Sequence, residues 1–346
     1  MLAHELLMIR ADANVEIATG HVMRCLALAQ GWRDQGGGVV FVMADSTPAI
    51  EKRLKVEEIH IERIDTEPGS GRDMELTRSL AAAKSAEWIV VDGYRFGADY
   101  QQRLKAAGQR VLFVDDYGHA THYSADLILN QNAHADETLY QHRANDTQLL
   151  LGPQYALLRR EFARWRESKR EIAAIGNRLL ITFGGSDPHN FTLRVLEALQ
   201  SPGLDGIEAA VVVGGNNPHL KSLEQAVGRR ADRLRLIRDA SNMPDLMGWA
   251  DCAVAAAGAT CWEMCLLGLP VLLVDLAPNQ LSTARRLDEL GAGSYLGNPS
   301  EVSSSAILER LQWLLSSAEK RAAMSAAGRT LVDGLGVSRV IRAMCN

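Results

Sequence analysis

"IRADANVEIATGHVMRCLALAQ", residues 9–30, contains the end of an apolar strand, a turn with Gly20 and His21, and the start of a helix. A strand that enters a helix through a glycine turn is typical of a βαβ fold. The glycine permits close approach of backbone or ligand, and the first helical N–H groups carry partial positive charge. We expect that charge to lower the pKa of His21, so that it can act as a neutral base. The alternative is a histidine that only caps or packs.

The bulk composition indicates a soluble globular protein of two domains. The chain has 346 residues, of which 47% are hydrophobic and 23% charged, and that length is large for one core. A formal net charge of -5 argues against nucleic-acid binding. The N-terminus lacks a signal-peptide pattern, and no apolar run reaches the roughly 20 residues of a membrane span. Five cysteines without regular pairing favour a cytoplasmic location.

Short apolar runs alternate with helical patterns along the first half of the chain. Continuous apolar strands of this kind are typical of a parallel sheet covered on both faces. The predicted strands are 6–10, 39–44, 59–64, 88–94, 110–116 and 126–131, and the predicted helices are 21–35, 48–56, 73–86 and 98–107.

A charged segment, 155–177, is predicted to be a helical connector, and a second α/β series follows it. We therefore predict two Rossmann-like α/β domains facing a cleft, over residues 1–165 and 166–346. Ligands of such folds bind outside the carboxyl ends of the strands. The second series has strands at 178–185, 209–215, 234–239, 252–258 and 271–277, with helices near 189–200, 218–229, 259–267, 281–290, 304–315 and 318–345.

Two strand ends in the first half carry polar side chains. In "VVDGYRFG" (90–97), Tyr94 can present its hydroxyl to the ligand, although a surface tyrosine is the simpler alternative. "FVDDYGHATH" (113–122) combines aspartates and histidines, which could suggest a metal site. We favour a capping aspartate and loop histidines there, and we predict neither a metal nor a cofactor.

Two turns in the second half are typical of anion or nucleotide binding. "LLITFGGSDPHN" (179–190) runs from a strand through glycines into a helix, and its backbone N–H groups can bind an anion. The alternative is a tight turn capped by Asp187. In "AAAGATCWEMCLLGLPVLLVDLAPNQ" (255–280), small residues leave room for phosphates, and Glu263 can hold ribose hydroxyls or form a capping box. The pair Cys261 and Cys265 is predicted to be packed in the core.

Taken together, "RADANVEIATGHVMRCLALA", "FGGSDP", "GATCWE" and "NQ" resemble the UDP-sugar hydrolases of pseudaminic acid biosynthesis. The resemblance runs over roughly the whole chain. It implies removal of UDP from UDP-2,4-diacetamido-2,4,6-trideoxy-β-L-altropyranose by metal-independent hydrolysis with inversion at the anomeric carbon. It also implies a GT-B-like fold, related to the glycosyltransferase that forms lipid II.

The resemblance assigns the family's catalytic histidine to His21 and its cleft tyrosine to Tyr94. This sequence departs from the family at Ala18, where glycine is common. The nucleotide-binding turns fall on Gly184–Asp187, Ala259–Glu263 and Asn279–Gln280. The complete set of substrate-binding candidates is Asp12, Gly20, Arg24, Asp116, Asn132, Gly184, Gly185, Ser186, Asp187, Ala259, Thr260, Cys261, Glu263, Asn279 and Gln280.

Two other functions fit the same residues. One is a GT-B glycosyltransferase that passes the sugar of a UDP-sugar donor to an acceptor, and the other is a non-catalytic UDP-sugar-binding protein. Consumption of UDP-sugar without an acceptor distinguishes a hydrolase from the glycosyltransferase. Turnover of UDP-sugar distinguishes a hydrolase from the non-catalytic binding protein. The expected partner is the UDP-sugar itself, with no membrane and no nucleic acid. A monomer is compatible with the sequence.

Overall fold

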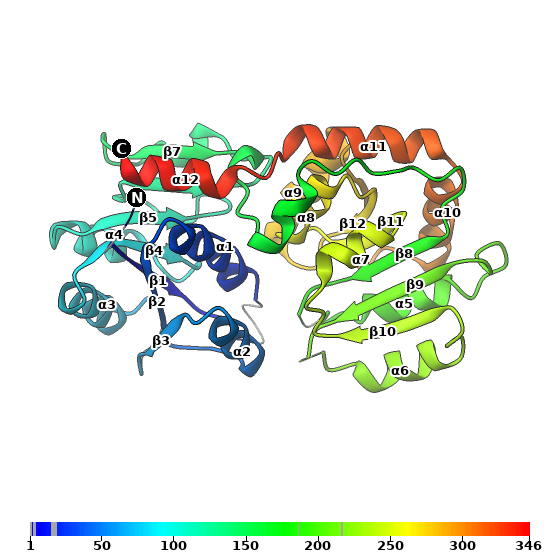
Figure 1. Ribbon diagram of the computed structural model, residues 1–346, viewed down its shortest axis with the longest axis horizontal. Helices are drawn as coiled ribbons and strands as arrows, with labels where there is room; N and C mark the ends of the chain where they lie inside the picture. Colours follow the sequence, from blue (N-terminus) through cyan, green and yellow to red (C-terminus); the bar gives the residue numbers. More distant parts are fainter. Residues whose placement is uncertain (1, 3–4, 15–18, 186, 216) are drawn as a thin grey trace. The chain divides into compact units, whose positions relative to one another are not determined.

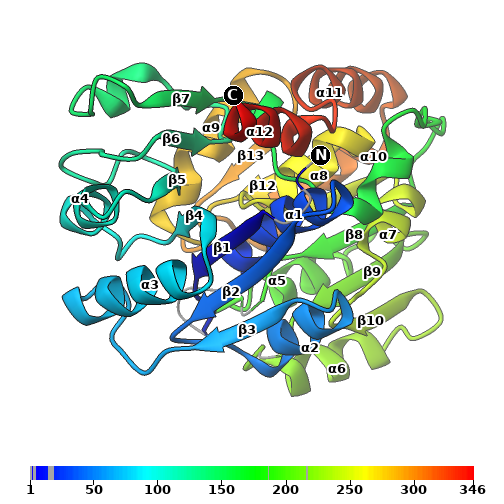
Figure 2. The same ribbon diagram turned by 60° about the vertical axis from the view of Figure 1, so that its left-hand side comes forward.

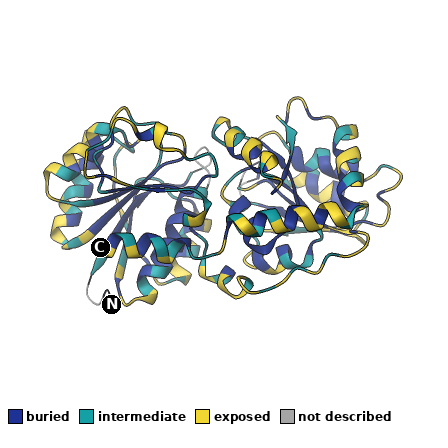
Figure 3. Ribbon diagram, turned by 90° about the horizontal axis from the view of Figure 1, so that it is seen from above, coloured by how far each residue is buried: buried dark blue, intermediate teal, exposed yellow. Residues whose placement is uncertain are grey.

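The chain folds into two compact units, which the computed structural model describes for residues 2, 5–14, 19–185, 187–215 and 217–346 (Figure 1). The first unit contains Met1–Arg160 and Gly334–Asn346, and the second contains Glu161–Asp333. Each unit has a parallel sheet between layers of helices. In both, the strands are largely buried and the outward faces of the helices are exposed (Figure 3).

The first unit is built on a parallel sheet of seven strands in the order β3-β2-β1-β4-β5-β6-β7 (Figure 2). Because both faces are covered, the central strands are apolar on both sides, which explains their continuous hydrophobic runs. The strands are β1 (Leu6–Ala11), β2 (Gly38–Met43), β3 (His60–Arg63), β4 (Ala86–Asp92), β5 (Arg110–Val114), β6 (Leu127–Asn130) and β7 (Gln148–Leu151).

Two apolar cores fix the helices of this unit to the two faces of the sheet. Leu7 and Ile9 of β1 point into the core formed with α1 (Gly20–Asp34), α2 (Pro48–Val56) and α12 (Gly336–Cys345). Met8, between them, points into the opposite core. That core is formed with α3 (Gly71–Ala83) and α4 (Ala98–Ala106). The unit also has short 3-10 turns, which are η1 (Glu137–Tyr140), η2 (Pro153–Tyr155) and the first residue of η3 (Arg160–Trp165).

The second unit has a parallel sheet of six strands in the order β10-β9-β8-β11-β12-β13. Helices α5, α6 and α10 share the core on one face, and α8 packs against α11. The strands are β8 (Arg178–Thr182), β9 (Glu208–Val213), β10 (Leu234–Arg238), β11 (Cys252–Ala256), β12 (Val271–Val274) and β13 (Ser294–Gly297). The helices are α5 (Phe191–Ala198), α6 (Leu220–Gly228), α7 (Met243–Trp249), α8 (Thr260–Leu267), α9 (Leu281–Glu289), α10 (Ser304–Leu315) and α11 (Ala318–Leu331), with η4 at Pro278–Gln280.

Both sheets reverse their strand order once, between β1 and β4 in the first unit and between β8 and β11 in the second. Connections on the two sides of such a point leave in opposite directions, so a crevice opens at the carboxyl ends of the two strands. The turns that follow β1, β4, β8 and β11 are therefore the places in each unit where a ligand is expected.

The predicted α/β class with two Rossmann-like domains is confirmed by these two sheets. The expected helix over 155–177 is wrong, because this segment contains only short 3-10 turns and irregular chain. Three short elements, β7, β13 and α7, were not predicted.

The structure divides the chain after Arg160 rather than after residue 165, and it assigns the last helix to the first unit. Helix α12 packs there because Val340, Ile341 and Met344 are buried in the core beside α1. The indole of Trp88 also donates a hydrogen bond to the carbonyl of Met344 at 3.2 Å. Helix α12 therefore packs on one face of the first sheet instead of extending the second unit.

Candidate functional site

His21 lies in the first turn of α1, directly after the β1 connection. The residue preceding the helix, Thr19, forms no side-chain hydrogen bond to the helix start. His21 is buried, with 8% of the residue exposed, and its Nδ1 lies 3.8 Å from Oδ1 of Asp92. Within the described part of the chain, this buried nitrogen has no hydrogen-bond partner. His21 therefore does not serve as a cap through Nδ1.

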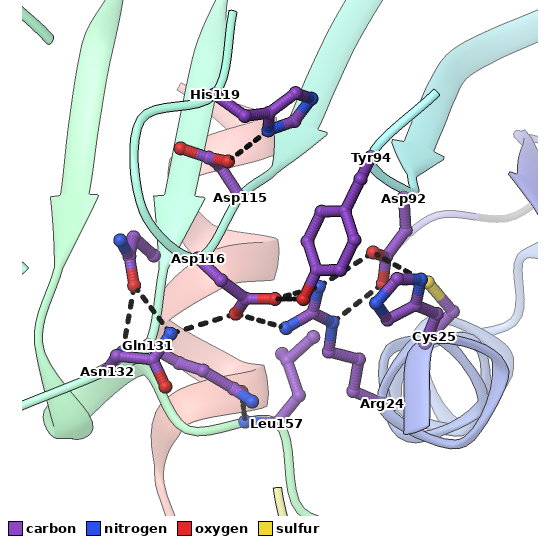
Figure 4. Close-up of polar contacts among 12 residues, drawn as sticks. Arg24, Cys25, Asp92, Tyr94, Asp115, Asp116, His119, Gln131, Asn132 and Leu157 are labelled. Carbon is purple, nitrogen blue, oxygen red and sulfur yellow. Dashed lines mark hydrogen bonds and ion pairs between the residues drawn. The ribbon is translucent and has the colours of Figure 1, made fainter. Parts of the chain in front are cut away.

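Arg24, one turn further along α1, binds two buried carboxylates. Its Nε and Nη2 each donate to Asp92 at 2.7 Å, and its Nη1 and Nη2 donate to Asp116 at 2.6 and 3.1 Å. Asp92 ends β4 and Asp116 follows β5, so the guanidinium joins the carboxyl ends of two strands (Figure 4). Planar bidentate pairs of this kind fix geometry as well as charge.

Tyr94 and Asn132 complete this cluster around Asp116. The hydroxyl of Tyr94 donates to Oδ2 of Asp116 at 2.6 Å, and the amide of Asn132 donates to Oδ1 at 2.8 Å. The ring of Tyr94 meets that of His21 edge-on, with centroids 4.8 Å apart. The structure thus brings five predicted site residues together. We call this group the Arg24 cluster: His21, Arg24, Tyr94, Asp116 and Asn132, with Asp92.

A third buried carboxylate, Asp115, supports the loop that carries Asp116. It accepts hydrogen bonds from the hydroxyls of Tyr123 and Tyr140 at 3.0 and 2.9 Å and lies 2.6 Å from Nδ1 of His119. The other nitrogen of His119 lies 3.2 Å from the carbonyl of Phe96. Both ring nitrogens thus face acceptors, which favours the imidazolium form.

The charges of the Arg24 cluster are set by burial and by its own ion pairs. Burial lowers the pKa of His21, and Asp92 opposes that effect without reversing it. Burial would raise the pKa of Asp116, but Arg24 outweighs it and holds the carboxyl below its usual range. Burial and Asp116 raise the pKa of Tyr94. The site therefore holds a neutral imidazole and a protonated phenol beside two carboxylates and one guanidinium at neutral pH.

Asp12 lies in a different network from the other candidates of the first unit. Its Oδ1 is 2.7 Å from Nη1 of Arg10, which is fully buried and also pairs with Asp73. The same oxygen accepts hydrogen bonds from the backbone of Ala44 and Asp45 at 2.8 and 3.1 Å. These contacts hold the carboxyl ends of β1 and β2 together. Gly20, by contrast, adjoins His21 and has open space where a Cβ would stand.

In the second unit, the turn after β8 has two parts with different environments. Gly184 has φ of 77°, and a Cβ on Gly184 or Gly185 would meet nothing within 4 Å. Asp187 is buried, and its carboxylate accepts hydrogen bonds from the backbone of Phe191 and Thr192, both at 2.9 Å. The first N–H groups of α5 are therefore already occupied, as in the capped-turn alternative. Ser186 lies outside the described residues, as does Ala18.

The turn after β11 leaves the start of α8 open. Ala259 precedes the helix without a side-chain cap, and it is exposed, while Thr260 is half-buried. Glu263 is half-buried in the first turn. Uncapped N–H groups at an accessible helix start attract anions. This end of the second sheet thus has the features expected for a phosphate site.

The remaining candidates of the second unit flank this turn. The side chain of Gln280 accepts a hydrogen bond from the backbone of Leu276 at 2.9 Å, and its Nε2 lies 3.6 Å from the Cβ position of Gly258. Asn279 adjoins it in η4. Cys261 and Cys265 are buried, and burial raises the pKa of both thiols. Their side chains are packed, as predicted.

Sequence reasoning missed Asp92, although it contacts both Arg24 and His21 of the cluster. Its oxygens accept from Arg24 and from the thiol of Cys25 at 3.3 Å, and one faces His21. The available signal was a carboxylate that ends an apolar strand directly before a glycine, in "VVDGY". No three His, Cys, Asp or Glu side chains among the described residues form a group that could hold a metal ion.

A search of the described helices found none that is both long and apolar enough to cross a membrane. Residues 179–334, which make up most of the second unit, match the family model of the glycosyltransferase family 28 C-terminal domain. The chain is 27% identical over 336 residues to the spore coat polysaccharide biosynthesis protein SpsG of Bacillus subtilis (strain 168), covering 95% of each chain.

Solved structures resemble the chain over nearly its full length. MurG of Acinetobacter baumannii has a TM-score of 0.68 at 17% identity, covering 99% of both chains. Anabaena HepE, solved in complex with UDP-glucose, has a TM-score of 0.61 at 16% identity, covering 99% of this chain and 100% of that one. The fold is GT-B-like. This confirms the predicted architecture of two parallel-sheet α/β domains.

Proposed function

We propose that this protein is an enzyme that hydrolyses a UDP-sugar, releasing UDP and the free sugar. The observation that carries the proposal is the state of His21. It is a buried imidazole with a lowered pKa, placed at an uncapped helix start at the point where the first sheet reverses its strand order. A neutral histidine at the ligand end of a sheet is suited to accept a proton at neutral pH.

The nucleotide is assigned to the second unit. Support comes from the glycosyltransferase family 28 C-terminal match over 179–334 and from the open start of α8. HepE, which shares the fold, was solved with UDP-glucose. We propose that the N–H groups at Ala259 and Thr260 bind the diphosphate, and that Glu263 accepts hydrogen bonds from the ribose hydroxyls.

In the proposed reaction, one O–H proton of water passes to Nε2 of His21 while the water oxygen attacks C1 of the sugar. The bond between C1 and the phosphate oxygen breaks, and its electron pair leaves with UDP. Attack opposite the leaving group inverts the anomeric centre. The positive end of α8 stabilises the charge that develops on the departing diphosphate.

We further propose that the sugar is a 2,4-diacetamido-2,4,6-trideoxyhexose, in the altrose configuration, and that the product serves pseudaminic acid synthesis. This assignment rests on the resemblance of the Gly-His, "FGGSDP" and "GATCWE" segments described above. The relative SpsG is itself named for polysaccharide biosynthesis.

Transfer of the sugar to an acceptor is the second candidate function. The observation that favours it is the family description of the second unit, which is that of a glycosyltransferase domain. Both functions use the same nucleotide contacts and a base near C1. They differ only in whether the attacking oxygen belongs to water or to an acceptor.

The test is release of UDP from purified UDP-diacetamidohexoses without any acceptor. We expect release by the wild-type protein, and a kcat roughly 10²–10⁴-fold lower for His21→Asn with KM little changed, because only the base is lost. His142→Asn, at an exposed loop position, is the matched control and should retain full activity. UDP release that requires an added acceptor would favour the glycosyltransferase, and binding without turnover would favour a binding protein.

A further inference from the structure

Asp92 is the buried carboxylate of the Arg24 cluster to which neither the sequence nor the proposed reaction has given a role. It is fully buried at the end of β4. Its Oδ1 accepts from Nη2 of Arg24, and its Oδ2 accepts from Nε of Arg24 and from the thiol of Cys25. A carboxylate oxygen can accept two hydrogen bonds. Oδ1 therefore keeps one acceptor position free.

The unpartnered ring nitrogen of His21 lies near this oxygen. Nδ1 lies 3.8 Å from Oδ1 of Asp92, and no described residue lies within hydrogen-bonding distance of it. A lone pair on Nδ1 would face the lone pairs of the carboxylate, whereas a proton on Nδ1 would point at them. The contact therefore favours the tautomer with Nδ1 protonated and Nε2 free to accept.

The backbone beside this contact leaves room for it to close. Gly93 follows Asp92 with φ of 148°, a conformation that favours glycine, and its Cβ position lies 3.9 Å from Nδ1 of His21. A Cβ there would lie 2.9 Å from the ring of Phe96 and in ordinary van der Waals contact with the imidazole. Arg24 meanwhile fixes the carboxylate through two 2.7 Å hydrogen bonds, so a small movement of the imidazole alone would form the hydrogen bond.

We propose that Asp92 is the positioning residue of His21: it selects the tautomer whose Nε2 accepts the proton, and it stabilises the imidazolium that forms. The inference rests on the proposed function for the identity of the reaction, but not for the tautomer. When Nε2 takes the proton from water, Nδ1 keeps its own proton. The Nδ1–H group then donates a hydrogen bond to the carboxylate of Asp92. The carboxylate keeps its two hydrogen bonds from Arg24 throughout.

The first test is the ¹⁵N spectrum of histidine-labelled wild-type protein at a pH where His21 is neutral, with assignment by His21→Asn. We expect Nδ1 of His21 in the protonated range and Nε2 in the unprotonated range. The opposite pattern would overturn the proposal. This measurement needs neither substrate nor a folded Asp92 variant, so it stands even if no UDP-sugar is hydrolysed.

The second test compares Asp92→Asn with Asp116→Asn, since both remove one negative charge from the Arg24 cluster and only Asp92 faces Nδ1. In Asp92→Asn we expect mixed or reversed tautomers, and an acid limb of kcat/KM shifted to lower pH, because Asp92 is the strongest group opposing the lowered pKa of His21. We also expect kcat to fall at least about 100-fold with KM within a few-fold.

In Asp116→Asn the Nδ1-protonated tautomer should persist. The charged or titratable groups around His21 are Asp92 of β4, Arg24 and Cys25 of α1, Tyr94 after β4, and Asp116 and His119 after β5. Only Asp92 among them is an acceptor facing Nδ1 in the described structure. An Asp92→Asn protein with the wild-type tautomer and an unmoved acid limb would show that Asp92 is only structural.

Discussion

Arg24 holds two carboxylates of the first unit in place with one planar group. Removing the guanidinium would leave Asp92 and Asp116 buried and unpaired, at a cost of about 3–5 kcal/mol for a broken buried pair. That cost makes Arg24 a poor probe of function. Because Arg24 already pairs with both carboxylates, a neutral His21 can lie beside them. The hydrogen bonds of Arg24 span 68 and 92 positions in the sequence.

Those separations explain what the sequence could and could not predict about the site. His21 and Tyr94 were found because each follows a strand at a glycine turn, and Asp116 because it follows another. Their mutual contacts depend on strand order, which local periodicity does not encode. Asp92 was missed because a carboxylate at a strand end also fits an ordinary cap or loop residue.

The lowered pKa of His21 predicts the pH dependence of the reaction. The neutral imidazole is the active form, so kcat/KM rises as pH increases through the pKa of the free enzyme. Burial places that pKa below the ordinary value of 6.5. We therefore expect the acid limb below pH 6.5, measured by initial rates in a constant-ionic-strength buffer series. A limb centred above 6.5 would contradict the assigned cause.

Glu263 is expected to contribute to nucleotide affinity. Glu263→Ala removes a charged hydrogen-bond acceptor one turn into α8, so the binding free energy of UDP should weaken by roughly 1–3 kcal/mol. Titration calorimetry measures this directly. Glu224→Ala, at an exposed position of α6, is the matched control. Equal affinities of the two variants would remove Glu263 from the nucleotide site.

Helix starts at the ends of the sheets differ in whether they are free to bind a ligand. Asp187 occupies the first N–H groups of α5, whereas α1 and α8 have no side-chain cap. The capped helix gains local stability. All three helices follow strands at the points where the strand order reverses, so the cap and not the position distinguishes α5 from α1 and α8. The distinction predicts that ligand binds at α1 and α8 rather than at α5.

The long central elements were predicted well because their apolar runs are strong, and α2 and α10 were predicted with their observed bounds. The segment 155–177 was misread because its spacing fits a helix. Tertiary contacts decide otherwise: Arg170 donates to the carbonyls of Met247, Ala250 and Leu267, which holds irregular chain against the second unit. Strands β7 and β13 have one buried residue each, whereas all four residues of β6 and of β12 are buried, so β7 and β13 lack a strong apolar run.

The packing of α12 on α1 supplies a test at the level of elements. A Cβ on Gly31 would lie 2.3 Å from a methyl carbon of Val337. Gly31→Val should therefore destabilise the first unit by about 1–3 kcal/mol through overpacking, measured by urea unfolding. Gly71→Ala, where a Cβ meets nothing within 4 Å, should be neutral or stabilising. A Gly31→Val protein of wild-type stability would contradict this packing.

The whole molecule consists of two α/β units, and each unit is built on a parallel sheet. Each has one reversal of strand order, and each carries a helix start without a side-chain cap there, with the proposed base in the first unit and the proposed diphosphate-binding turn in the second. The chain returns to the first unit through α12, so the first unit combines two segments far apart in sequence, whereas the second unit is one continuous segment. The proposed hydrolysis assigns the base to the first unit and the nucleotide to the second.

The most direct test of that hydrolysis is to follow the oxygen of water. Purified protein is incubated with UDP-2,4-diacetamido-2,4,6-trideoxy-β-L-altropyranose in H₂¹⁸O without an acceptor, and both products are analysed promptly by mass spectrometry. Attack of water at C1 predicts one ¹⁸O in the released sugar and none in UDP, and no release by His21→Asn on the same time scale. Label in the UDP phosphate, or intact substrate until an acceptor is added, would contradict the account.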